Sequence, residues 1–337
     1  MSSVKIVIGM PNWVGDAVLA LPTLGTLRAA YPEAEIWVAA RDWVKELFAP
    51  GHSVRGVIPL PQVRDLKSLR EAVRRIRVHK FDIAILLTNS FSSALVFRLA
   101  GVKERWGYAR DGRGFLLTRG IPVKDGWAPL NQRDYYLALL AGLGLEPVSK
   151  EIDLYVSAEE KEAADSALAA AGRDPARPLV ILNPGAAYGP AKRWPARQFA
   201  TLARILRSRA NAEIVLVGSQ GDREAAAEIA SAYGGILIDF TGRTSLRELA
   251  GIISRARAFV TNDTGPMHMA NALRVPVIAL FGPTDPGRTG PFQPPSSVLK
   301  KDVPCWPCLY RACPYDHRCM TGIDPEDVFA ACREYLS

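Results

Sequence analysis

The feature that most constrains the fold is an alternation of short apolar runs with longer segments of helical period, which continues along all 337 residues. The apolar runs are rich in β-branched residues and have the length of strands. Strands separated by helices in this way form βαβ units, whose strands lie parallel in one sheet. The sequence therefore predicts an α/β fold built from parallel sheets.

The pattern runs twice along the chain. In the first half we expect strands at residues 5–9, 36–39, 56–60, 82–87 and 105–108, and helices at 17–30, 66–79, 92–100 and 133–143. In the second half we expect strands at 179–183, 213–217, 236–239, 258–262 and 277–280, and helices at 159–171, 197–207, 223–233, 246–254 and 265–273. Asp324 is the expected N-cap of a last helix that begins at Pro325.

A seam separates the two halves at residues 144–155, where a proline and mixed charges interrupt the periodicity. We expect two domains, residues 1–150 and 151–337, because the chain is too long for one ordinary core. Both domains are predicted to be Rossmann-like and to face each other across a cleft. Ligands of such open sheets bind at the carboxyl ends of the strands, so the loops after the strands are the places to look for chemistry.

The net charge of +8 favours anionic partners such as nucleotides, phospholipids or phosphorylated glycans. The sequence contains no helix-turn-helix signature, RNP motif or long Lys/Arg run, which argues against nucleic acid as a partner. No apolar run approaches the roughly 20 residues that span a bilayer, and the first residues lack the features of a signal peptide. The expected location is the cytoplasm.

The loop after the first expected strand, residues 9–16, holds a candidate carboxylate. Gly9 and Gly15 are too far apart for the glycine fingerprint of dinucleotide-binding folds, which argues against a NAD-dependent dehydrogenase. Asp16 lies at the start of the first expected helix, and two interpretations of it remain open. It is either the N-cap of that helix or a base that accepts a proton from a hydroxyl.

Residues 183–195 follow a strand of the second half and open a helix. Two glycines in this loop let the backbone approach a ligand closely. Lys192 and Arg193 lie near the helix N-terminus, where cations are unfavourable unless an anion lies between them. The alternative is a surface loop with solvated charges.

Residues 261–268 end a second strand and begin another helix. Asp263, Thr264 and the backbone N–H groups from Gly265 onward are suited to phosphate or ribose oxygens. His268, in the first turn, is either a structural residue or a ligand contact. Residues 282–286 form a third loop at the same sheet edge, and three such loops suit a nucleotide-diphosphate site better than a hydride-transfer site.

These loops carry a resemblance to a known family. The segments are residues 11–16 with Pro22, 184–195 (PGAAYGPAKRWP), 262–268 (NDTGPMH) and 281–286 (FGPTDP). In their order and spacing the sequence resembles the bacterial lipopolysaccharide heptosyltransferases of glycosyltransferase family nine, and among them the type II enzymes most. The resemblance covers almost the whole chain. It implies a GT-B fold, an ADP-heptose donor in the second domain, and an inner-core lipopolysaccharide acceptor approached from the first.

The resemblance also implies inversion at the anomeric carbon without a required metal or other cofactor. It makes Asp16 the general base and Lys192 the group that stabilises the departing diphosphate. Glu224 would hold the adenosine ribose, with Asp222 as its rival. The full set of implied donor-binding residues is Gly185, Ala186, Lys192, Glu224, Asp263, Thr264, Gly265 and His268.

The basic segment 64–80 contains Arg74, Arg75 and Arg77. These three residues either form a solvated face or bind phosphorylated core sugars of the acceptor or the anionic cytoplasmic leaflet. We expect a monomer that associates peripherally with the cytoplasmic face of the inner membrane.

Four of the five cysteines lie close together in the sequence. Three states remain open for this cluster: a structural zinc site, disulfides or an iron–sulfur remnant, and free thiols in a packed loop. A cytosolic cluster favours metal over disulfides. The residues concerned are Cys305, Cys308, Cys313 and Cys319.

Three rival functions are compatible with the same architecture. They are a glycosyltransferase with another nucleotide-sugar donor, a sugar-nucleotide epimerase that needs no acceptor, and a nucleotide-sugar-binding protein without activity. The presence of Asp16 argues against the last of these.

Overall fold

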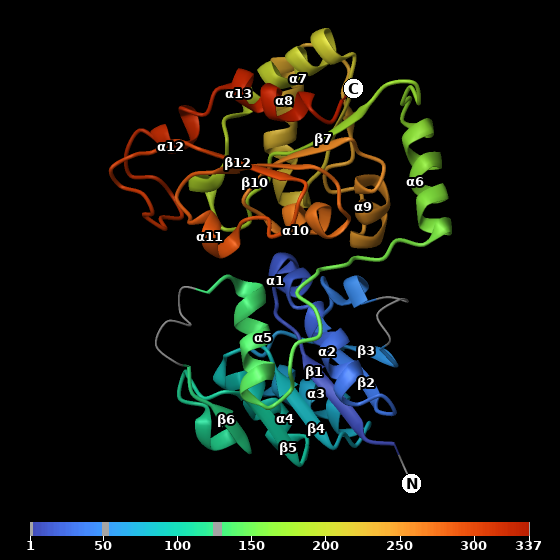
Figure 1. Ribbon diagram of the computed structural model, residues 1–337, viewed down its shortest axis with the longest axis vertical. Helices are drawn as coiled ribbons and strands as arrows, with labels where there is room; N and C mark the ends of the chain where they lie inside the picture. Colours follow the sequence, from blue (N-terminus) through green and yellow to red (C-terminus); the bar gives the residue numbers. More distant parts are fainter. Residues whose placement is uncertain (1–2, 49–53, 124–129, 337) are drawn as a thin grey trace. The chain divides into compact units, whose positions relative to one another are not determined.

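The computed structural model describes residues 3–48, 54–123 and 130–336 of the chain. The chain folds as two compact units, Met1–Tyr155 and Val156–Ser337 (Figure 1). The boundary between them falls at the end of the seam that the sequence places at residues 144–155. Each unit is an open parallel sheet with helices packed against it.

The first unit contains a six-stranded sheet in the order β3-β2-β1-β4-β5-β6. Its paired strands are all parallel, which is the strand order of a Rossmann fold. The strands are β1 (Lys5–Gly9), β2 (Glu35–Arg41), β3 (Gly56–Leu60), β4 (Ile83–Leu86), β5 (Glu104–Tyr108) and β6 (Arg119–Ile121).

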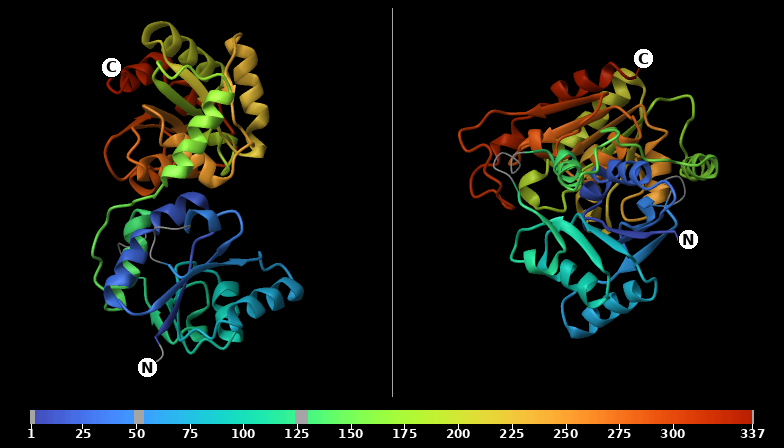
Figure 2. Two further views of the ribbon diagram at one scale, coloured as in Figure 1. Left: turned by 90° about the vertical axis from the view of Figure 1, so that its right-hand side faces the viewer. Right: turned by 60° about the horizontal axis from the view of Figure 1, so that its bottom comes forward.

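The helices of the first unit form two layers. Helices α1 and α2 both contact α5, and α3 contacts α4. The two groups lie on opposite faces of the sheet (Figure 2). Their bounds are α1 (Val14–Leu19), α2 (Pro22–Ala30), α3 (Leu66–Arg77), α4 (Phe91–Leu99) and α5 (Gln132–Gly142).

The second unit repeats this topology, with a six-stranded sheet in the order β12-β11-β10-β7-β8-β9. Its paired strands are also all parallel. The strands are β7 (Leu179–Asn183), β8 (Glu213–Leu216), β9 (Ile238–Asp239), β10 (Ala258–Asn262), β11 (Val277–Phe281) and β12 (Ser296–Lys300).

Helices α7, α8 and α13 pack together on one face of the second sheet, and α6, α9 and α10 pack together on the other. The helices are α6 (Ala158–Ala170), α7 (Ala196–Ala210), α8 (Arg223–Tyr233), α9 (Leu246–Ile253), α10 (Gly265–Ala272), α11 (Pro286–Thr289), α12 (Arg318–Thr321) and α13 (Pro325–Arg333). Asp324 caps α13 by accepting the N–H of Glu326, as the sequence predicts.

The central strands β7, β10 and β11 are buried along their whole length. Strands covered by helices on both faces are apolar continuously rather than alternately, which is why their positions can be read from the sequence. The buried core on the α7 face joins these strands to side chains such as Trp194, Phe199 and Phe329. A rigid sheet of this kind fixes the ends of its strands, where the loops of interest begin.

The structure corrects two features of the sequence-based expectation. The helix expected at residues 17–30 is two helices, because Pro22 begins α2 and cannot continue the hydrogen bonds of α1. The edge strands β6 and β12 were not predicted. The residues of β12 are half-buried or exposed, so they lack the apolar run that marks the central strands.

Candidate active site

The candidate site of the second unit lies where the strand order reverses. Strands β7 and β10 are neighbours at the centre of the sheet, and the chain leaves them in opposite directions. The loops that follow these two strands therefore diverge and leave a crevice at the carboxyl edge of the sheet. The loop after β7 contains Lys192, and the loop after β10 contains Asp263.

A buried ion pair joins the two loops. The Lys192 ammonium donates to Oδ2 of Asp263, and both side chains are less than a tenth exposed. The hydroxyls of Thr284 and Thr289 donate to the same oxygen, at 2.7 and 3.2 Å. One carboxylate oxygen thus collects three donors from three segments of the chain, which fixes the position of Lys192.

This arrangement limits the chemical roles of Asp263 and Lys192. A carboxylate repels a diphosphate, so the role that fits Asp263 is to position Lys192 rather than to contact phosphate oxygens. An ammonium has three N–H groups, and Asp263 does not use them all. Lys192 also lies over the ring of Tyr188, with 4.7 Å from Nζ to the ring centroid, so its ammonium contacts both a carboxylate and an aromatic ring.

His268 lies in the first turn of α10 and is almost completely buried. Its ring stacks on Phe292 at a centroid distance of 6.1 Å. Burial lowers its pKa to about 4, and the charge of Lys192 acts in the same direction while Asp263 opposes it. Its Nδ1 is buried without a hydrogen-bond partner in the part of the chain that the structure describes. A neutral ring with an unsatisfied nitrogen is suited to a ligand contact.

Asn262 joins the end of β10 to the loop after β7. Its side chain is fully buried; Nδ2 donates to the carbonyl of Pro184 at 2.8 Å, and Oδ1 accepts the N–H of Trp194 at 3.0 Å. Gly185 lies in the same loop, and a Cβ at this position would come within 2.5 Å of Asp222. The glycine therefore allows the backbone to pass close to a buried carboxylate.

The two rival acids at the start of α8 differ in their surroundings. Asp222 is buried and accepts from the N–H and the hydroxyl of Ser219, at 2.9 and 2.6 Å, while Arg193 lies 3.7 Å from its other oxygen. Glu224 is exposed and lines a cavity together with Arg193. Asp222 is thus occupied by the protein, and Glu224 is the acid that a ligand can reach.

The segment that contains the four clustered cysteines supports the Lys192 loop. The Arg311 carbonyl accepts the N–H of Ala191 at 3.0 Å, and the Leu309 carbonyl accepts the Tyr188 hydroxyl at 2.6 Å. His317 Nε2 lies 2.7 Å from the carbonyl of Ala191. The segment also touches the Thr284 loop, because Trp306 Nε1 donates to the Thr284 carbonyl at 3.1 Å.

None of the four cysteines forms a disulfide in the described structure. Burial raises the pKa of the Cys319 thiol, and the thiols of Cys313, Cys308 and Cys305 add to this effect. Cys305, Cys313 and Cys319 line one cavity. Over residues 3–48, 54–123 and 130–336, no group of three or more His, Cys, Asp or Glu side chains is arranged to hold a metal ion. The predicted zinc at this cluster stays a prediction.

In the first unit, Asp16 is the third residue of α1, and Trp13 is the N-cap. The interpretation of Asp16 as an N-cap is therefore wrong. Its side chain is half-buried and lies near Tyr136 of α5, whose pKa is raised by burial and, to a smaller extent, by the Asp16 carboxylate.

The three arginines expected to bind the acceptor already have partners within the first unit. Arg74 and Arg75 pair with Glu71, each at 2.7 Å, and Arg75 also donates to the carbonyl of Pro59. Arg77 donates to the carbonyl of Leu99, at the C-terminal end of α4. Their role in acceptor binding stays a prediction.

Comparison with known proteins decides the family. A model of glycosyltransferase family 9 (heptosyltransferase) matches residues 69–318. The lipopolysaccharide heptosyltransferase 2 of Salmonella typhimurium is 34% identical over 311 residues, which cover 88% of each chain. The lipooligosaccharide heptosyltransferase 2 of Haemophilus influenzae is 33% identical, also with 88% of each chain covered. The chain belongs to glycosyltransferase family 9.

A solved structure agrees with this assignment. The ADP-heptose LPS heptosyltransferase II of E. coli has a TM-score of 0.85 and 31% identity, and the match covers 99% of this chain and 98% of that one. The family 9 chain described here is thus an enzyme, a glycosyltransferase with the GT-B type of fold. None of the helices in the described parts of the chain is long and apolar enough to cross a membrane.

Several site residues could not be identified from the sequence alone. Thr284 lies in a loop that the sequence singles out, but its bond to Asp263 depends on a contact between residues 21 positions apart. Thr289 follows in the short helix α11 and carries no motif signal. Asn262 is part of a motif, yet only the structure reveals that it ties two loops together.

Proposed function

We propose that this enzyme transfers a heptose from ADP-heptose to a hydroxyl of the lipopolysaccharide inner core. The names of its relatives support both the donor and the acceptor: one is an ADP-heptose LPS heptosyltransferase, and others are lipopolysaccharide heptosyltransferases. A sugar-nucleotide epimerase is the less favoured alternative, because the relatives named here that share 30% or more of their residues with this chain are heptosyltransferases.

The donor is proposed to bind to the second unit. The observation that carries this proposal is the buried cation at Lys192, which is held beside the N-terminus of α10 by Asp263 and two threonines. The helix end adds partial positive charge, and Gly265 supplies a backbone N–H there, whereas the next residue, Pro266, has none. His268 and Thr264 complete the proposed diphosphate and heptose contacts.

The nucleoside end of the donor is proposed to lie against the loops after β7 and β8. Gly185 and Ala186 allow close approach of the backbone, and Glu224 is the acid proposed to bind the ribose hydroxyls. Asp222 is disfavoured in this role because Ser219 and Arg193 already occupy its oxygens.

The proposed reaction is a single displacement with inversion. The acceptor hydroxyl oxygen forms a bond to the anomeric carbon while the bond from that carbon to the diphosphate oxygen breaks, and ADP leaves with the bonding electrons. Asp16 takes the proton of the hydroxyl, which is a poor nucleophile while protonated. Lys192 meets the charge that grows on the departing diphosphate, so a catalytic metal is not required.

The location of the enzyme and its further partners belong to the proposal as well. A lipid-linked acceptor places the enzyme at the cytoplasmic face of the inner membrane, as a peripheral monomer without nucleic-acid partners. The net charge of +8 supports attraction to an anionic surface, and Arg74, Arg75 and Arg77 are candidate contacts for phosphorylated core sugars or lipid. A structural zinc at Cys305, Cys308, Cys313 and Cys319 is proposed only as an addition to this mechanism.

Two measurements test the function. The purified protein is incubated with ADP-heptose and a heptose-deficient lipopolysaccharide acceptor, and mass spectrometry is used to detect one added heptose. Melting temperature is then compared with ADP, UDP and GDP, since a ligand that binds only the folded state raises it. Transfer from ADP-heptose with stabilisation by ADP is expected. A larger effect of UDP and transfer from UDP-sugars would leave the family intact but overturn the donor.

A further inference from the structure

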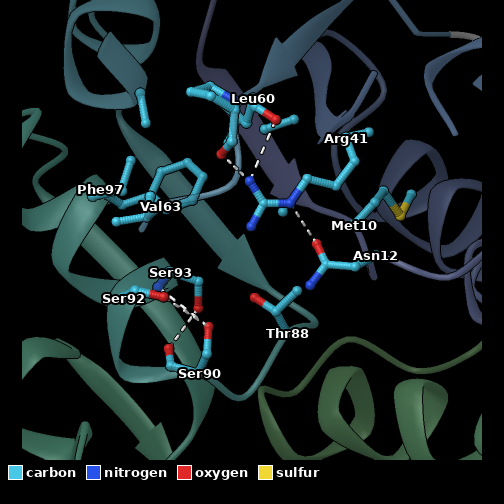
Figure 3. A pocket seen from close by; sticks show the side chains of 16 residues that line it. Met10, Asn12, Arg41, Leu60, Val63, Thr88, Ser90, Ser92, Ser93 and Phe97 are labelled. Atoms are coloured by element: carbon cyan, nitrogen blue, oxygen red, sulfur yellow. Dashed lines mark hydrogen bonds between the residues drawn. The ribbon is translucent and has the colours of Figure 1, made fainter. Parts of the chain in front are cut away.

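The first unit has its own pocket at the carboxyl edge of its sheet (Figure 3). It is formed by the ends of β1 to β4 and the loops after them, at the position where the strand order of this sheet reverses. Open α/β sheets bind ligands at this position. Its polar lining residues are Asn12, Arg41, Thr88, Ser90, Ser92 and Ser93.

Among the described residues that line this pocket, Arg41 is the only cation and none is acidic. It is half-buried at the end of β2, where its guanidinium donates to Asn12 Oδ1 at 2.9 Å and to the carbonyls of Leu60, at 3.3 Å, and Pro61. All these partners are neutral. Burial lowers the pKa of Arg41, with no carboxylate opposing the shift. A charge withdrawn from water is costly unless an opposite charge compensates it, and no carboxylate in the described part of this unit forms an ion pair with Arg41.

The opposite wall of the pocket carries hydroxyl groups. Ser90 is the N-cap of α4 and accepts the N–H of Ser93, and the Ser92 hydroxyl lies 3.4 Å from that of Ser90. In Figure 3 these serines and Thr88 lie on the side of the pocket away from the Arg41 guanidinium. Hydroxyls can donate to an anion, and the N-terminus of α4 adds partial positive charge.

A second arginine lies behind the wall that carries the hydroxyl groups. Arg113 is completely buried and donates to the carbonyls of Thr88 and Tyr108, and to the Ser93 hydroxyl at 3.4 Å. One of its terminal nitrogens is buried without a hydrogen-bond partner among residues 3–48, 54–123 and 130–336. The pocket is therefore flanked by two arginines that form no ion pair with those residues.

The size of the pocket limits its ligand. A cavity of about 40 Å³ has room for one small group, since a single water needs roughly 10–15 Å³ by the same measure. A sugar ring does not fit. We propose that this pocket binds one anionic oxygen group of the acceptor, a carboxylate or a phosphate, between Arg41 and the hydroxyls of Ser90 and Ser92.

This inference rests on the proposed function, because it assigns the anion to the acceptor. It differs from the earlier expectation that Arg74, Arg75 and Arg77 bind the acceptor. Arg74 and Arg75 already pair with Glu71, whereas Arg41 pairs with no carboxylate among residues 3–48, 54–123 and 130–336. A charge that lacks a partner gains more from an incoming anion than one that must first leave its own.

Arg41→Gln tests the contact in the whole enzyme. We expect its KM for the acceptor to rise by about 10- to 100-fold, the range for loss of one charge-assisted hydrogen bond, with KM for ADP-heptose unchanged. Arg41→Lys retains the charge and should recover part of the affinity. Arg28→Gln is the matched control, because Arg28 is also half-buried and also donates to backbone carbonyls of the same unit, those of Tyr31, Pro32 and Ala34. It should leave both KM values unchanged.

The chemical nature of the anion is tested with modified acceptors. One acceptor is methyl-esterified to remove its carboxylate charges, and a second is dephosphorylated. One of the two modifications is expected to be energetically coupled to Arg41. That modification should raise the acceptor KM of the wild type but leave the acceptor KM of Arg41→Gln unchanged. A carboxylate is identified by the first acceptor and a phosphate by the second. If neither modification couples to Arg41 while transfer proceeds, the inference is overturned and the proposed function stands.

A labelling experiment tests anion binding at Arg41 and does not require heptose transfer. Phenylglyoxal modification of Arg41 and Arg28 is followed by peptide mass spectrometry with inorganic phosphate, acetate or neither present. Protection of Arg41 but not Arg28 by one of the two anions supports the pocket even if no heptose is transferred. Equal labelling of Arg41 under all three conditions would contradict it.

Discussion

At the residue scale, the second unit is organised around one oxygen atom. Oδ2 of Asp263 receives Lys192, Thr284 and Thr289, so a single carboxylate sets the position of the cation proposed to meet the diphosphate. Removing one partner of a buried ion pair leaves the other charge uncompensated, which costs more than the pair contributes. Removal of either member of this pair should therefore lower the stability of the second unit.

Lys192→Ala is expected to weaken ADP binding and lower turnover together. The cation faces a diphosphate that is charged in the ground state and more so in the transition state, so kcat should fall further than ADP affinity. Calorimetric ADP binding and steady-state kinetics measure the two effects. Lys192→Arg retains the positive charge but changes the geometry of the ion pair with Asp263. This variant should recover ADP affinity better than turnover. Normal ADP affinity and rate in the alanine variant would rule out the contact.

Asp16→Asn is expected to reduce turnover by roughly 10²- to 10⁴-fold, because an amide cannot accept the proton of the hydroxyl. Donor affinity should be almost unchanged, since the donor is proposed to bind to the other unit. Melting temperature should change little, because the substitution keeps the size of the side chain. Turnover within a factor of two of the wild type would show that Asp16 is not the base.

His268 gives the ligand-free enzyme a pH dependence of stability. Its folded-state pKa of about 4 lies below the ordinary 6.5, so between these values the unfolded chain binds a proton that the native protein does not. Stability should fall as the pH decreases from 6.5 to 4, by up to about 1.4 kcal/mol per pH unit. His268→Asn should have a shallower decline in unfolding free energy over that window. Parallel curves for the two proteins would contradict a neutral buried histidine.

Part of this site could be read from the sequence. The sequence identifies Lys192, Asp263 and His268 as candidates because each lies in a segment that follows a predicted strand. Their pairing was not, since Lys192 and Asp263 are 71 positions apart and the sequence gives no distance between two loops. For the same reason Asp263 was expected to hold the diphosphate, whereas its surroundings favour a positioning role.

At the element scale, the segment 305–319 behaves as a support for the Lys192 loop rather than as an independent module. Its backbone carbonyls accept from the Tyr188 hydroxyl and the Ala191 N–H. Gly189 lies between these two contacts, and a Cβ there would overlap the carbonyl of Arg311. The distance between the two segments is therefore set by a position that only glycine can occupy.

Gly189→Ala is expected to separate these segments and displace Lys192, which should weaken ADP binding by about tenfold. Its matched control is Gly172→Ala, because Gly172 also has a positive φ but a Cβ there would meet no atom within 4 Å. Both variants should lose stability, since alanine is strained at positive φ. Only Gly189→Ala should lose ADP affinity, measured by titration calorimetry. Equal affinities in the two variants would mean that the segment does not control the loop.

Elements were predictable to the extent that they are buried. The central strands β1, β7 and β10 have the bounds expected from their apolar runs. The strands β6 and β12 were missed because their residues are half-buried or exposed and form no apolar run. The break before Pro22 could have been inferred from proline chemistry alone.

At the scale of the whole molecule, the two units repeat one topology but differ in how they hold charge. The second unit pairs its buried cation with a carboxylate. In the described part of the first unit, Arg41 donates to neutral groups instead. Each reversal point is thus suited to an anion, and the proposed function assigns the donor diphosphate to one and an acceptor group to the other. Neither assignment needs a metal to neutralise charge.

The last prediction concerns metal. Transfer should persist in excess EDTA, because Lys192 and the N-terminus of α10 can neutralise the diphosphate. The cysteine cluster makes a second measurement necessary: a structural zinc at Cys305 to Cys319 would appear as about one equivalent in elemental analysis. Its removal would lower the melting temperature before it reduced the rate.

A catalytic metal would behave in the opposite way, with activity lost at once on chelation and restored by magnesium while the melting temperature stayed constant. Recording rate and melting temperature on the same EDTA-treated sample separates the two cases. We expect an unchanged initial rate in EDTA whether or not zinc is present. Because segment 305–319 contacts the Lys192 loop, slow loss of both stability and rate would indicate structural zinc, whereas prompt inactivation reversed by magnesium would overturn the metal-free mechanism.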